Sequence, residues 1–292
     1  MSEFVYGPLH SVMIEHRIVS IKHRHRVAYY YMSKGLFNTF MQYLNEGIYL
    51  FMHVSETEKR MKVVMVKSVE SLDKIMFPDR QNPQIYYDIT LIKSGIKTIM
   101  NQTKPKLFLD LEMSMPPYHD YEHFVSEIIQ CGVVLVNEAN EVVLKASNFV
   151  LPTLFPELSS RTKKFLHITQ EDISQGITYE AFYRWLDDLF KKFKPMVVVW
   201  GQNDLIEIKK SCQLHHLPDI TRHVQFIDLL KLHKHFYRLK NDLGLFNAYN
   251  AYATEDLDIQ VHDALEDASV THYIFEQFRS VCNNERRIEL HQ

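Results

Sequence analysis

Short runs rich in Val, Ile, Tyr and Met, separated by polar residues, fill the first third of the chain and are typical of strands. Between two of them, Phe37, Phe40, Met41 and Leu44 recur at the spacing of one helix face, which predicts a helix over residues 35–46. Several short strands with one helix suit a small barrel of the OB or SH3 kind. The predicted strands cover residues 11–20, 26–32, 48–54 and 61–69.

A polar stretch between Pro78 and Pro83 predicts a loop at the end of this segment. Isoleucines spaced three or four residues apart then predict a connecting helix; they are Ile89, Ile92, Ile96 and Ile99. The pattern therefore divides the chain into three parts. These are a β-rich domain over residues 1–85, a connecting helix over 86–104 and a second domain over 105–292.

From residue 106 onward, three strand candidates in hairpin order are followed by alternating helices and strands. Residues 137–140 form a turn signal between the second and third strands, and the apolar run 196–200 is typical of a central strand covered on both faces. This order predicts an α/β fold with a mixed β-sheet flanked by helices. The strands cover 106–113, 128–136, 142–150 and 196–200, and the helices cover 179–193, 205–214, 229–239 and 264–279.

Composition excludes several classes of protein. The 292 residues include only 8 glycines, no two closer than 12 positions, so neither a Rossmann dinucleotide loop nor a P-loop can form. No apolar run approaches the roughly 18 residues of a membrane span. The first ten residues lack the features of a signal peptide, and three scattered cysteines cannot form a disulfide framework. We expect a cytoplasmic protein without membrane contact.

Charge differs between the two segments. Residues 1–104 hold 14 Lys and Arg against 9 Asp and Glu, whereas residues 105–292 hold 19 against 27. The basic run at residues 22–26, beside three tyrosines at 29–31, could contact phosphates and stack on bases. Packing of strand tyrosines is the alternative. The charge split predicts that residues 1–85 form a nucleic-acid-binding module that presents a strand to an acidic second domain.

Two carboxylates fall on one face of the strand predicted over residues 106–113. Asp110 and Glu112 lie two positions apart and share this face with Phe108, while the intervening leucines point into a core. Two acids placed so close together repel each other unless a cation lies between them. A solvent-facing strand edge is the alternative for a pair of this kind.

Further ionisable residues follow later in the chain. Asp204 comes just after the central strand, where ligands bind in open α/β sheets, although it could equally cap a helix. Asp267 shares a helix face with the small residues Ala264, Ala268 and Thr271, which would let that helix approach a sheet closely. His262 can face the same site if it belongs to the preceding loop, and it could then act as a general base.

Together these residues resemble the motif of the DEDDh 3′–5′ exonucleases, the DnaQ-like family with an RNase-H-like fold. The resemblance covers about residues 105–280. Segment 127–130 is similar to the second strand of the family, and segments 152–153, 166–169, 228–229 and 239–245 are similar to its Eri/KapD-type branch. The resemblance implies that Asp110, Glu112, Asp204 and Asp267 bind metal and that His262 is the catalytic base. It also implies substrate contacts from Met113, Ser114, His167 and Asn203.

Two departures from the family pattern concern these contacts. Ser114 stands where many members have Thr, and His167 stands where a glycine is common. The resemblance implies two Mg²⁺ or Mn²⁺ ions, and oxygen ligands suit such hard cations. It further implies release of nucleoside 5′-monophosphates from the 3′ end of single-stranded or 3′-overhanging nucleic acid, with RNA favoured.

Other functions remain open from the residues alone. A DNA-directed exonuclease of the proofreading or repair type would carry the same acids, and so would an idle nucleic-acid-binding scaffold on this fold. An RNase-H-like endonuclease would share the acids but not the spacing of His262 and Asp267. A zinc cluster around Cys212 and His215 is disfavoured because no fourth thiolate is near. Asp263 and Glu266 are interpreted as charges at a helix N-terminus, and Asp228 as a helix cap.

Overall fold

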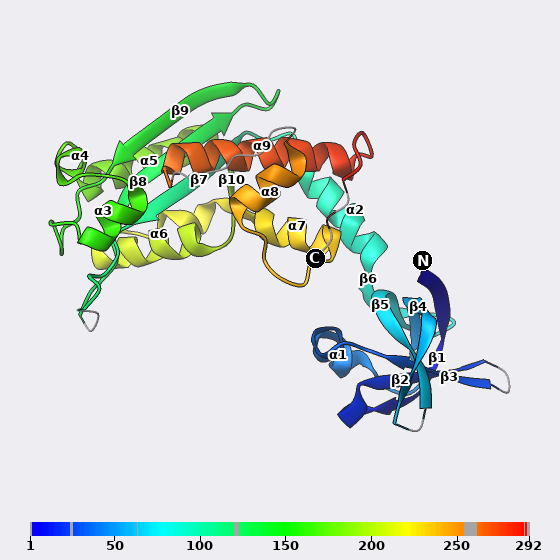
Figure 1. Ribbon diagram of the computed structural model, residues 1–292. Coiled ribbons are helices and arrows are strands. Elements are labelled where there is room, and N and C mark those ends of the chain that lie inside the picture. The colour runs from blue at the N-terminus through cyan, green and yellow to red at the C-terminus, as the bar shows by residue number, and fades with distance from the viewer. Residues whose placement is uncertain are drawn as a thin grey trace. The chain divides into compact units, whose positions relative to one another are not determined.

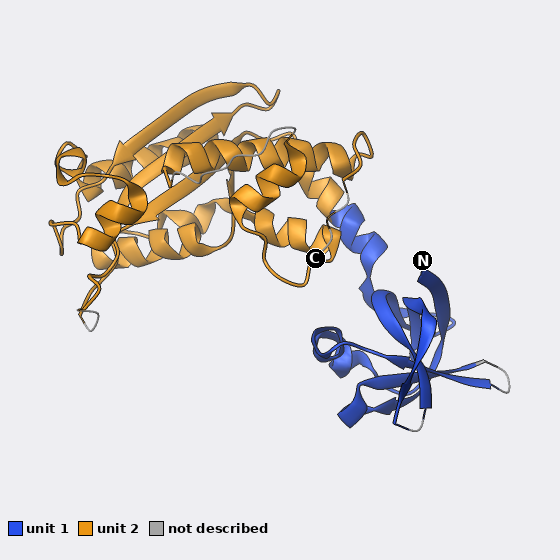
Figure 2. Cartoon of the chain, viewed as in Figure 1, with its two compact units in different colours: residues 1–95 blue, residues 96–292 orange. Residues whose placement is uncertain are grey.

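The computed structural model describes residues 2–23, 26–62, 64–119, 123–253, 262–288 and 290. The chain divides into two compact units, Met1–Gly95 and Ile96–Gln292 (Figure 2). The division falls inside the helix α2 (Ile89–Met100), which agrees with the helix predicted from the isoleucine spacing. Asp88 starts this helix, because its carboxylate accepts hydrogen bonds from the backbone amides of Thr90 and Leu91.

The first unit is a β-barrel. Its sheet has the strand order β3-β2-β1-β4-β5-β6, and a parallel pairing of β3 with β5 closes the first five strands on themselves. The helix α1 (Lys34–Phe40) lies between β3 and β4 in sequence. A closed five-stranded barrel of this order is the OB arrangement among the two barrels that the sequence predicted. The strands are β1 (Ser2–Met13), β2 (Ile18–His23), β3 (Arg26–Tyr31), β4 (Tyr49–Met61), β5 (Val64–Phe77) and β6 (Gln84–Asp88).

Several predictions for this unit were wrong in detail. Residues 11–20 do not form one strand, because the chain turns at η1 (Ile14–His16) and Arg17 takes a left-handed conformation with φ 53°. No glycine or proline marks this turn. The helix predicted over 35–46 ends at Phe40 and continues as the 3-10 turn η2 (Met41–Tyr43). The strand predicted over 61–69 includes the last residue of β4, and β5 begins at Val64 and extends to Phe77. Strand β6, which follows directly on Pro83, was missed. Two residues of the basic run, Arg24 and His25, lie outside the described residues.

The second unit is built on a five-stranded mixed sheet with the order β11-β10-β7-β8-β9. Strand β7 pairs antiparallel with β8 and parallel with β10. The mixed sheet confirms the predicted fold class. Its strands are β7 (Lys106–Met113), β8 (Ile128–Val136), β9 (Val142–Phe149), β10 (Met196–Val199) and β11 (Gln225–Asp228).

Helices cover both faces of this sheet (Figure 1). On one face, Leu107, Leu109 and Leu111 pack with residues of α5 (Tyr179–Phe193) and α6 (Asn203–Leu214). On the other face, Phe108 packs edge-on against Phe275 of α9 (Ala264–Cys282). The alternation along β7 therefore separates an apolar core from the face that carries the two acids. The remaining helices are α3 (Ser160–Leu166), α4 (Gln170–Ser174), η3 (Ile220–His223), α7 (Leu229–Tyr237) and α8 (Leu245–Tyr252).

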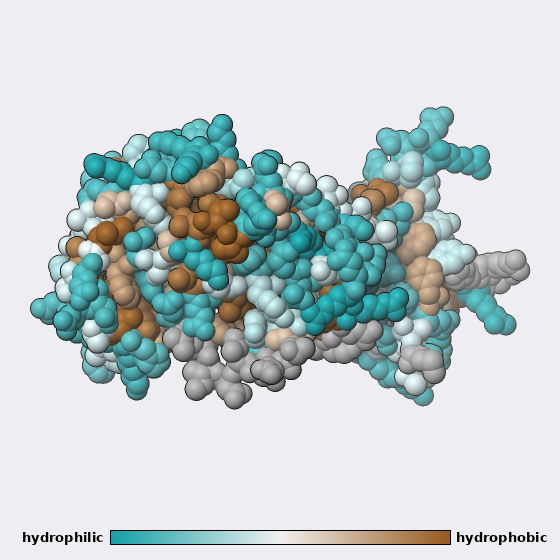
Figure 3. All heavy atoms as spheres, turned by 90° about the horizontal axis from the view of Figure 1, so that it is seen from above, coloured by the Kyte–Doolittle hydropathy of each residue, from teal (hydrophilic) through white to brown (hydrophobic). Residues whose placement is uncertain are grey.

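The face of the molecule seen in Figure 3 is mostly hydrophilic, with separate hydrophobic areas set among the hydrophilic residues. Large exposed apolar side chains occur in both units, for example Tyr6 in the first and Phe165 in the second. Within the described part of the chain, no helix has the length and apolar character needed to cross a bilayer.

Candidate active site

Strand β7 brings Asp110 and Glu112 to one face of the sheet. Glu112 is 9% exposed, and its strand neighbours Leu109 and Leu111 are buried on the opposite face. Asp110 lies opposite Gly132 of β8, and Glu112 lies opposite Gln130. The pleat of a central strand thus places both carboxylates on the same face, and the backbone of β7 keeps them close together.

The carboxylate of Asp204 reaches β7 from the first turn of α6. One of its oxygens accepts a hydrogen bond of 3.1 Å from the backbone amide of Leu111, which lies between the two acids in sequence. Asp204 is 6% exposed. The helix starts at Asn203, and Gln202 occupies its N-cap, so Asp204 does not cap the helix. Its hydrogen bond instead ties α6 to the strand that carries Asp110 and Glu112.

Close contact between α9 and β8 places the fourth acid. A Cβ atom added to Gly132 would lie 2.1 Å from the carbonyl carbon of Ala264, so only glycine lets the start of this helix reach the sheet. Ala264 and Ala268 are fully buried, as the small residues on this face predicted. Asp267, one turn into α9 and 5% exposed, is thereby held over the strands.

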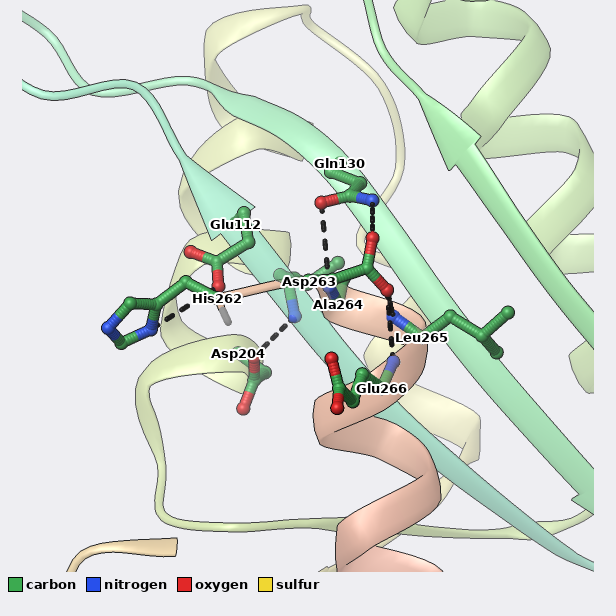
Figure 4. Close-up of polar contacts among 9 residues, drawn as sticks. Glu112, Gln130, Asp204, His262, Asp263, Ala264, Leu265 and Glu266 are labelled. Atoms are coloured by element: carbon green, nitrogen blue, oxygen red, sulfur yellow. Dashed lines mark hydrogen bonds and ion pairs between the residues drawn. The ribbon is translucent and has the colours of Figure 1, made fainter. Parts of the chain in front are cut away.

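A polar pair fixes the start of α9 (Figure 4). Asp263 caps the helix, because one of its oxygens accepts from the amides of Leu265 and Glu266. Its other oxygen accepts a 2.7 Å hydrogen bond from the side-chain amide of Gln130 on β8. The interpretation of Asp263 as a helix N-terminal charge is confirmed. Gln130 was missed as a supporting residue, since the contact joins positions far apart in sequence.

His262 lies beside Glu112 just before α9. Its Nδ1 is 4.0 Å from a carboxylate oxygen of Glu112. The imidazole also stacks on the ring of Phe165 in α3, with centroids 4.2 Å apart and planes inclined by 24°. Burial, followed by the nearby His167, lowers the pKa of His262. The imidazole is therefore neutral near pH 7 and can accept a proton.

The acids of this site hold protons more tightly than free carboxylates do. Burial, then the charges of Asp267, Asp204 and Asp263, raises the pKa of Glu112 to about 8. Burial also raises the pKa of Asp204 to about 7, although the amide of Leu111 opposes the rise. The pKa of Asp110 lies well above its ordinary value because of burial and then Asp204, Asp267 and Glu112. Asp204 and Asp267 contribute to the raised pKa of both Asp110 and Glu112, so negative charge accumulates around strand β7.

This arrangement fits a divalent cation. Ligand atoms of Glu112, Asp267 and His262 all lie within 4.8 Å of one another, a spacing that a single ion can bridge. Within the described residues this group includes neither Asp110 nor Asp204. The charges of Glu112 and Asp267 nevertheless act on Asp110, as does the charge of Asp204. A cation would relieve the mutual repulsion of the acids, and carboxylate oxygens are the donors that Mg²⁺ and Mn²⁺ prefer.

Comparison with known proteins identifies the family. Residues 107–275 match the RNase_T family model, whose description is exonuclease. A probable 3′-5′ exonuclease, KapD of Bacillus subtilis (strain 168), is 32% identical over 174 residues, covering 59% of this chain and 83% of that protein. This chain belongs to the RNase_T exonuclease family.

Solved structures show the same fold for the second unit. The nuclease domain of 3′hExo, a DEDDh family member bound to rAMP, has a TM-score of 0.54 at 22% identity, over 65% of this chain and 98% of that one. A full-length 3′-exonuclease has a TM-score of 0.55 at 22% identity, and the match covers 64% of each chain. The resemblance to the DEDDh exonucleases and to their RNase-H-like fold is confirmed. The protein is accordingly an exonuclease, a hydrolase that acts on nucleic acid.

Residues predicted to contact substrate in this exonuclease lie at three places. Met113 ends β7 and packs against the core, and Asn203 is exposed at the start of α6. Ser114 is 4% exposed, and its hydroxyl accepts a hydrogen bond from the backbone amide of Glu127. That bond joins the end of β7 to the start of β8. Substrate contact by these three residues stays a prediction.

His167 occupies a backbone position that favours glycine. It follows the last residue of α3 in the left-handed region, with φ 55° and ψ 32°. Glycine adopts this conformation without steric cost, which accounts for the glycine that is common there in the family. The exposed imidazole acts on the pKa of His262, so His167 lies near the site. Its contact with substrate also stays a prediction.

A buried acid outside the predicted set supports the loop after β9. Glu127 is 3% exposed, and its carboxylate accepts hydrogen bonds from the amides of Thr153, Leu154 and Phe155 and from the Thr153 hydroxyl. Sequence reasoning missed this role because the partners are 26 to 28 positions away.

Cys212, disfavoured as a zinc ligand, is buried beside the Tyr179 hydroxyl, and His215 stacks on the Tyr179 ring.

Proposed function

We propose that this exonuclease is a divalent-metal-dependent 3′–5′ enzyme that releases nucleoside 5′-monophosphates, with RNA favoured over DNA. The observation that carries the proposal is the grouping of Glu112, Asp267 and His262 within 4.8 Å, with Asp204 bonded to the strand that carries Glu112. The Nδ1 atom of His262 lies 4.0 Å from Glu112. Phosphodiester hydrolysis needs a group that takes a proton from the attacking water and positive charge near the leaving oxygen.

Each residue of the site has a separate role in this proposal. Asp110, Glu112, Asp204 and Asp267 would hold Mg²⁺ or Mn²⁺, and such ions stabilise charge on the attacking and leaving oxygens. His262 would accept the proton of the water, since its lowered pKa keeps the imidazole neutral at physiological pH. Phe165 would fix the plane of the imidazole through the ring stack.

Names of related proteins support the direction of cleavage and the substrate. The B. subtilis relative is described as a probable 3′-5′ exonuclease. One structure of similar fold, with a TM-score of 0.54 at 22% identity, is described as recognising the 3′ end of a histone mRNA stem-loop. We infer the same polarity for this chain, and RNA as the preferred substrate.

Digestion of matched RNA and DNA strands of one sequence, labelled at either end, tests the proposal. With Mg²⁺ or Mn²⁺, we expect a 5′-labelled RNA strand to give a descending ladder and a 3′-labelled strand to release labelled mononucleotide at once. The Asp110→Asn variant serves as the inactive control. Faster digestion of DNA would assign the enzyme to the DNA-directed class, and binding without cleavage by the native chain would assign it to the scaffolds.

A further inference from the structure

Two cations approach one tyrosine at the end of strand β3. The Nζ atom of Lys59 lies 4.5 Å from the centre of the Tyr31 ring, and the guanidinium carbon of Arg17 lies 5.6 Å from it. Arg17 also donates a 3.1 Å hydrogen bond to the Tyr31 hydroxyl. The Tyr31 ring thus contacts cationic side chains from two segments that are more than 40 positions apart in sequence.

The same place joins two loops of the barrel. Arg17 ends the turn between β1 and β2, and Lys62 lies in the turn between β4 and β5. The Nζ atom of Lys62 is 3.0 Å from Nε2 of His16. In OB barrels these two loops, together with the face of strands 2 and 3, form the surface that takes up oligonucleotides. We call Arg17, Tyr31, Lys59 and Lys62 the Tyr31 cluster.

Charge at the Tyr31 cluster is not cancelled. Residues 14–17 and 58–62 include four Lys or Arg and two carboxylates, Glu15 and Glu58, so positive charge remains in excess. Among the described residues, neither Arg17, Lys59 nor Lys62 forms an ion pair with a carboxylate. The Nε atom of Arg17 is buried without an acceptor, again within the described part of the chain. A polyanion is the ligand that this excess charge favours.

Another exposed surface of the barrel has a different character. Tyr6 on β1 stacks on Phe51 of β4 with ring centroids 5.7 Å apart, and Phe4 lies beside them. In the pairing of β4 with β5, Lys74 lies opposite Phe51. This lysine forms an ion pair of 3.2 Å with Asp88. This aromatic surface therefore lacks the free positive charge of the Tyr31 cluster and is less suited to phosphates.

We propose that the Tyr31 cluster binds the phosphate backbone of single-stranded nucleic acid, as a second contact site for the substrate of this exonuclease. The proposal rests on the proposed function, since the strand bound there is the one that the second unit digests. Lys59, Lys62 and Arg17 contact phosphates, and Tyr31 keeps Arg17 and Lys59 on one face of the barrel. Protein ligands are less favoured, because the cluster offers cations rather than an apolar groove.

Binding by the full chain tests this site. In an Asp110→Asn background, which prevents digestion, fluorescence anisotropy with a labelled 20-nucleotide RNA gives Kd over a range of salt concentrations. Each phosphate contact contributes about 0.7 to the log–log salt slope for single strands, which at 0.1 M salt corresponds to about five-fold in Kd. We expect Lys59→Ala to lower the slope by about 0.7 and Arg17→Ala with Lys59→Ala to lower it by about 1.4.

A matched control and a second readout make the result decisive. Lys34→Ala removes the same charge from the exposed start of α1 and should leave Kd and slope unchanged. Should Arg17→Ala prevent folding, the exposed Lys59 alone decides the question. Equal Kd and slope for Lys59→Ala and Lys34→Ala would overturn the proposal and favour a protein ligand for this unit.

Cleavage of a dinucleotide separates this site from the active site. With Asp110 intact, Lys59→Ala should cleave a dinucleotide at the native rate, because so short a substrate does not need a second contact. The same variant should raise KM several-fold on the 20-nucleotide strand. A native chain that binds the strand but cleaves neither substrate would refute the proposed function and leave the binding site standing. Loss of dinucleotide cleavage in Lys59→Ala would overturn the site.

Discussion

Phe165 stacks on His262 across two elements that are almost 100 positions apart in sequence, with ring centroids 4.2 Å apart. Phe165 is 43% exposed although it is a large apolar residue. An aromatic pair of this kind contributes about 0.5–1.5 kcal/mol beyond the area it buries. The stack thus holds the imidazole in one orientation beside Glu112. Because Phe165 is largely exposed, this role takes no apolar side chain from the core.

Replacing Phe165 by Ala should lower kcat on a dinucleotide up to about ten-fold, because 1.4 kcal/mol corresponds to a factor of ten in rate. KM should change little. Phe165→Tyr keeps the stacked ring and should therefore retain the native kcat. A side chain that only supported the fold would not be expected to give this recovery of kcat. Val143→Ala, at an exposed apolar site on β9, is the control and should remain fully active. Native kcat in Phe165→Ala would contradict the positioning role.

His262→Ala should lower kcat by about two orders of magnitude or more, since loss of a general base costs about 10² to 10⁴ in rate. Metal affinity, followed by isothermal titration with Mn²⁺, should stay within a few-fold of the native value. Asp110→Ala should instead abolish both metal binding and cleavage. His223→Ala, which removes an exposed imidazole from η3, is the matched control and should leave kcat unchanged. If His262 served chiefly as a metal ligand, its loss would weaken Mn²⁺ binding in parallel with kcat.

Most of the second unit could be predicted from the sequence, because its signals are local. Strands β7 and β8 and helix α5 have the predicted boundaries, since long apolar runs and a strong helical period mark them. Short elements such as α4 and β11 carry too few residues for a period to show. In the barrel, the turn at Arg17 interrupts an apolar run without glycine or proline, so no local signal marks it.

For the active site, the sequence indicated which residues matter but not what holds them. Spacing along β7 placed Asp110 and Glu112 on one face, and the motif added the remaining acids and His262. Their supports are contacts between distant positions: Gln130 with Asp263, and Phe165 with His262. Such contacts leave no periodic pattern in a single sequence. The roles of the site residues in catalysis stay predictions.

Stability of the metal-free protein should fall as pH rises from about 4 to about 8. Glu112 has its pKa raised to about 8 and Asp204 to about 7, whereas in the unfolded chain both titrate near their ordinary values of 4.5 and 3.8. Their contribution to stability is therefore complete below about pH 4 and is lost as pH rises through 7 to 8. Thermal unfolding in EDTA should show this decrease, and Mg²⁺ should reverse it at pH 8.5.

Neutral variants provide the check on this pH dependence. Glu112→Gln should raise Tm in EDTA at pH 8.5, because it removes one charge from the cluster, and should weaken the response to Mg²⁺. Glu138→Gln, in the exposed turn between β8 and β9, makes the same chemical change and should alter neither quantity. A metal-free Tm that stays constant between pH 5 and 8.5 would show that the pKa values of Glu112 and Asp204 are not raised in the folded chain.

Gly132→Ala should destabilise the second unit by about 3 kcal/mol or more, because overpacking a close contact costs about 1–3 kcal/mol even where side chains can yield. Here the added Cβ would lie 2.1 Å from backbone atoms of Ala264, which cannot move without lifting α9 from the sheet. Asp267 would move with the helix, so Mn²⁺ affinity should fall as well. Gly35→Ala on α1 is the control: no atom lies within 4 Å of its added Cβ, and alanine favours a helix. Urea unfolding and metal titration of the two variants measure both effects. Native stability in Gly132→Ala would mean that α9 does not contact β8 at this residue, and the placement of Asp267 over β7 would fall with it.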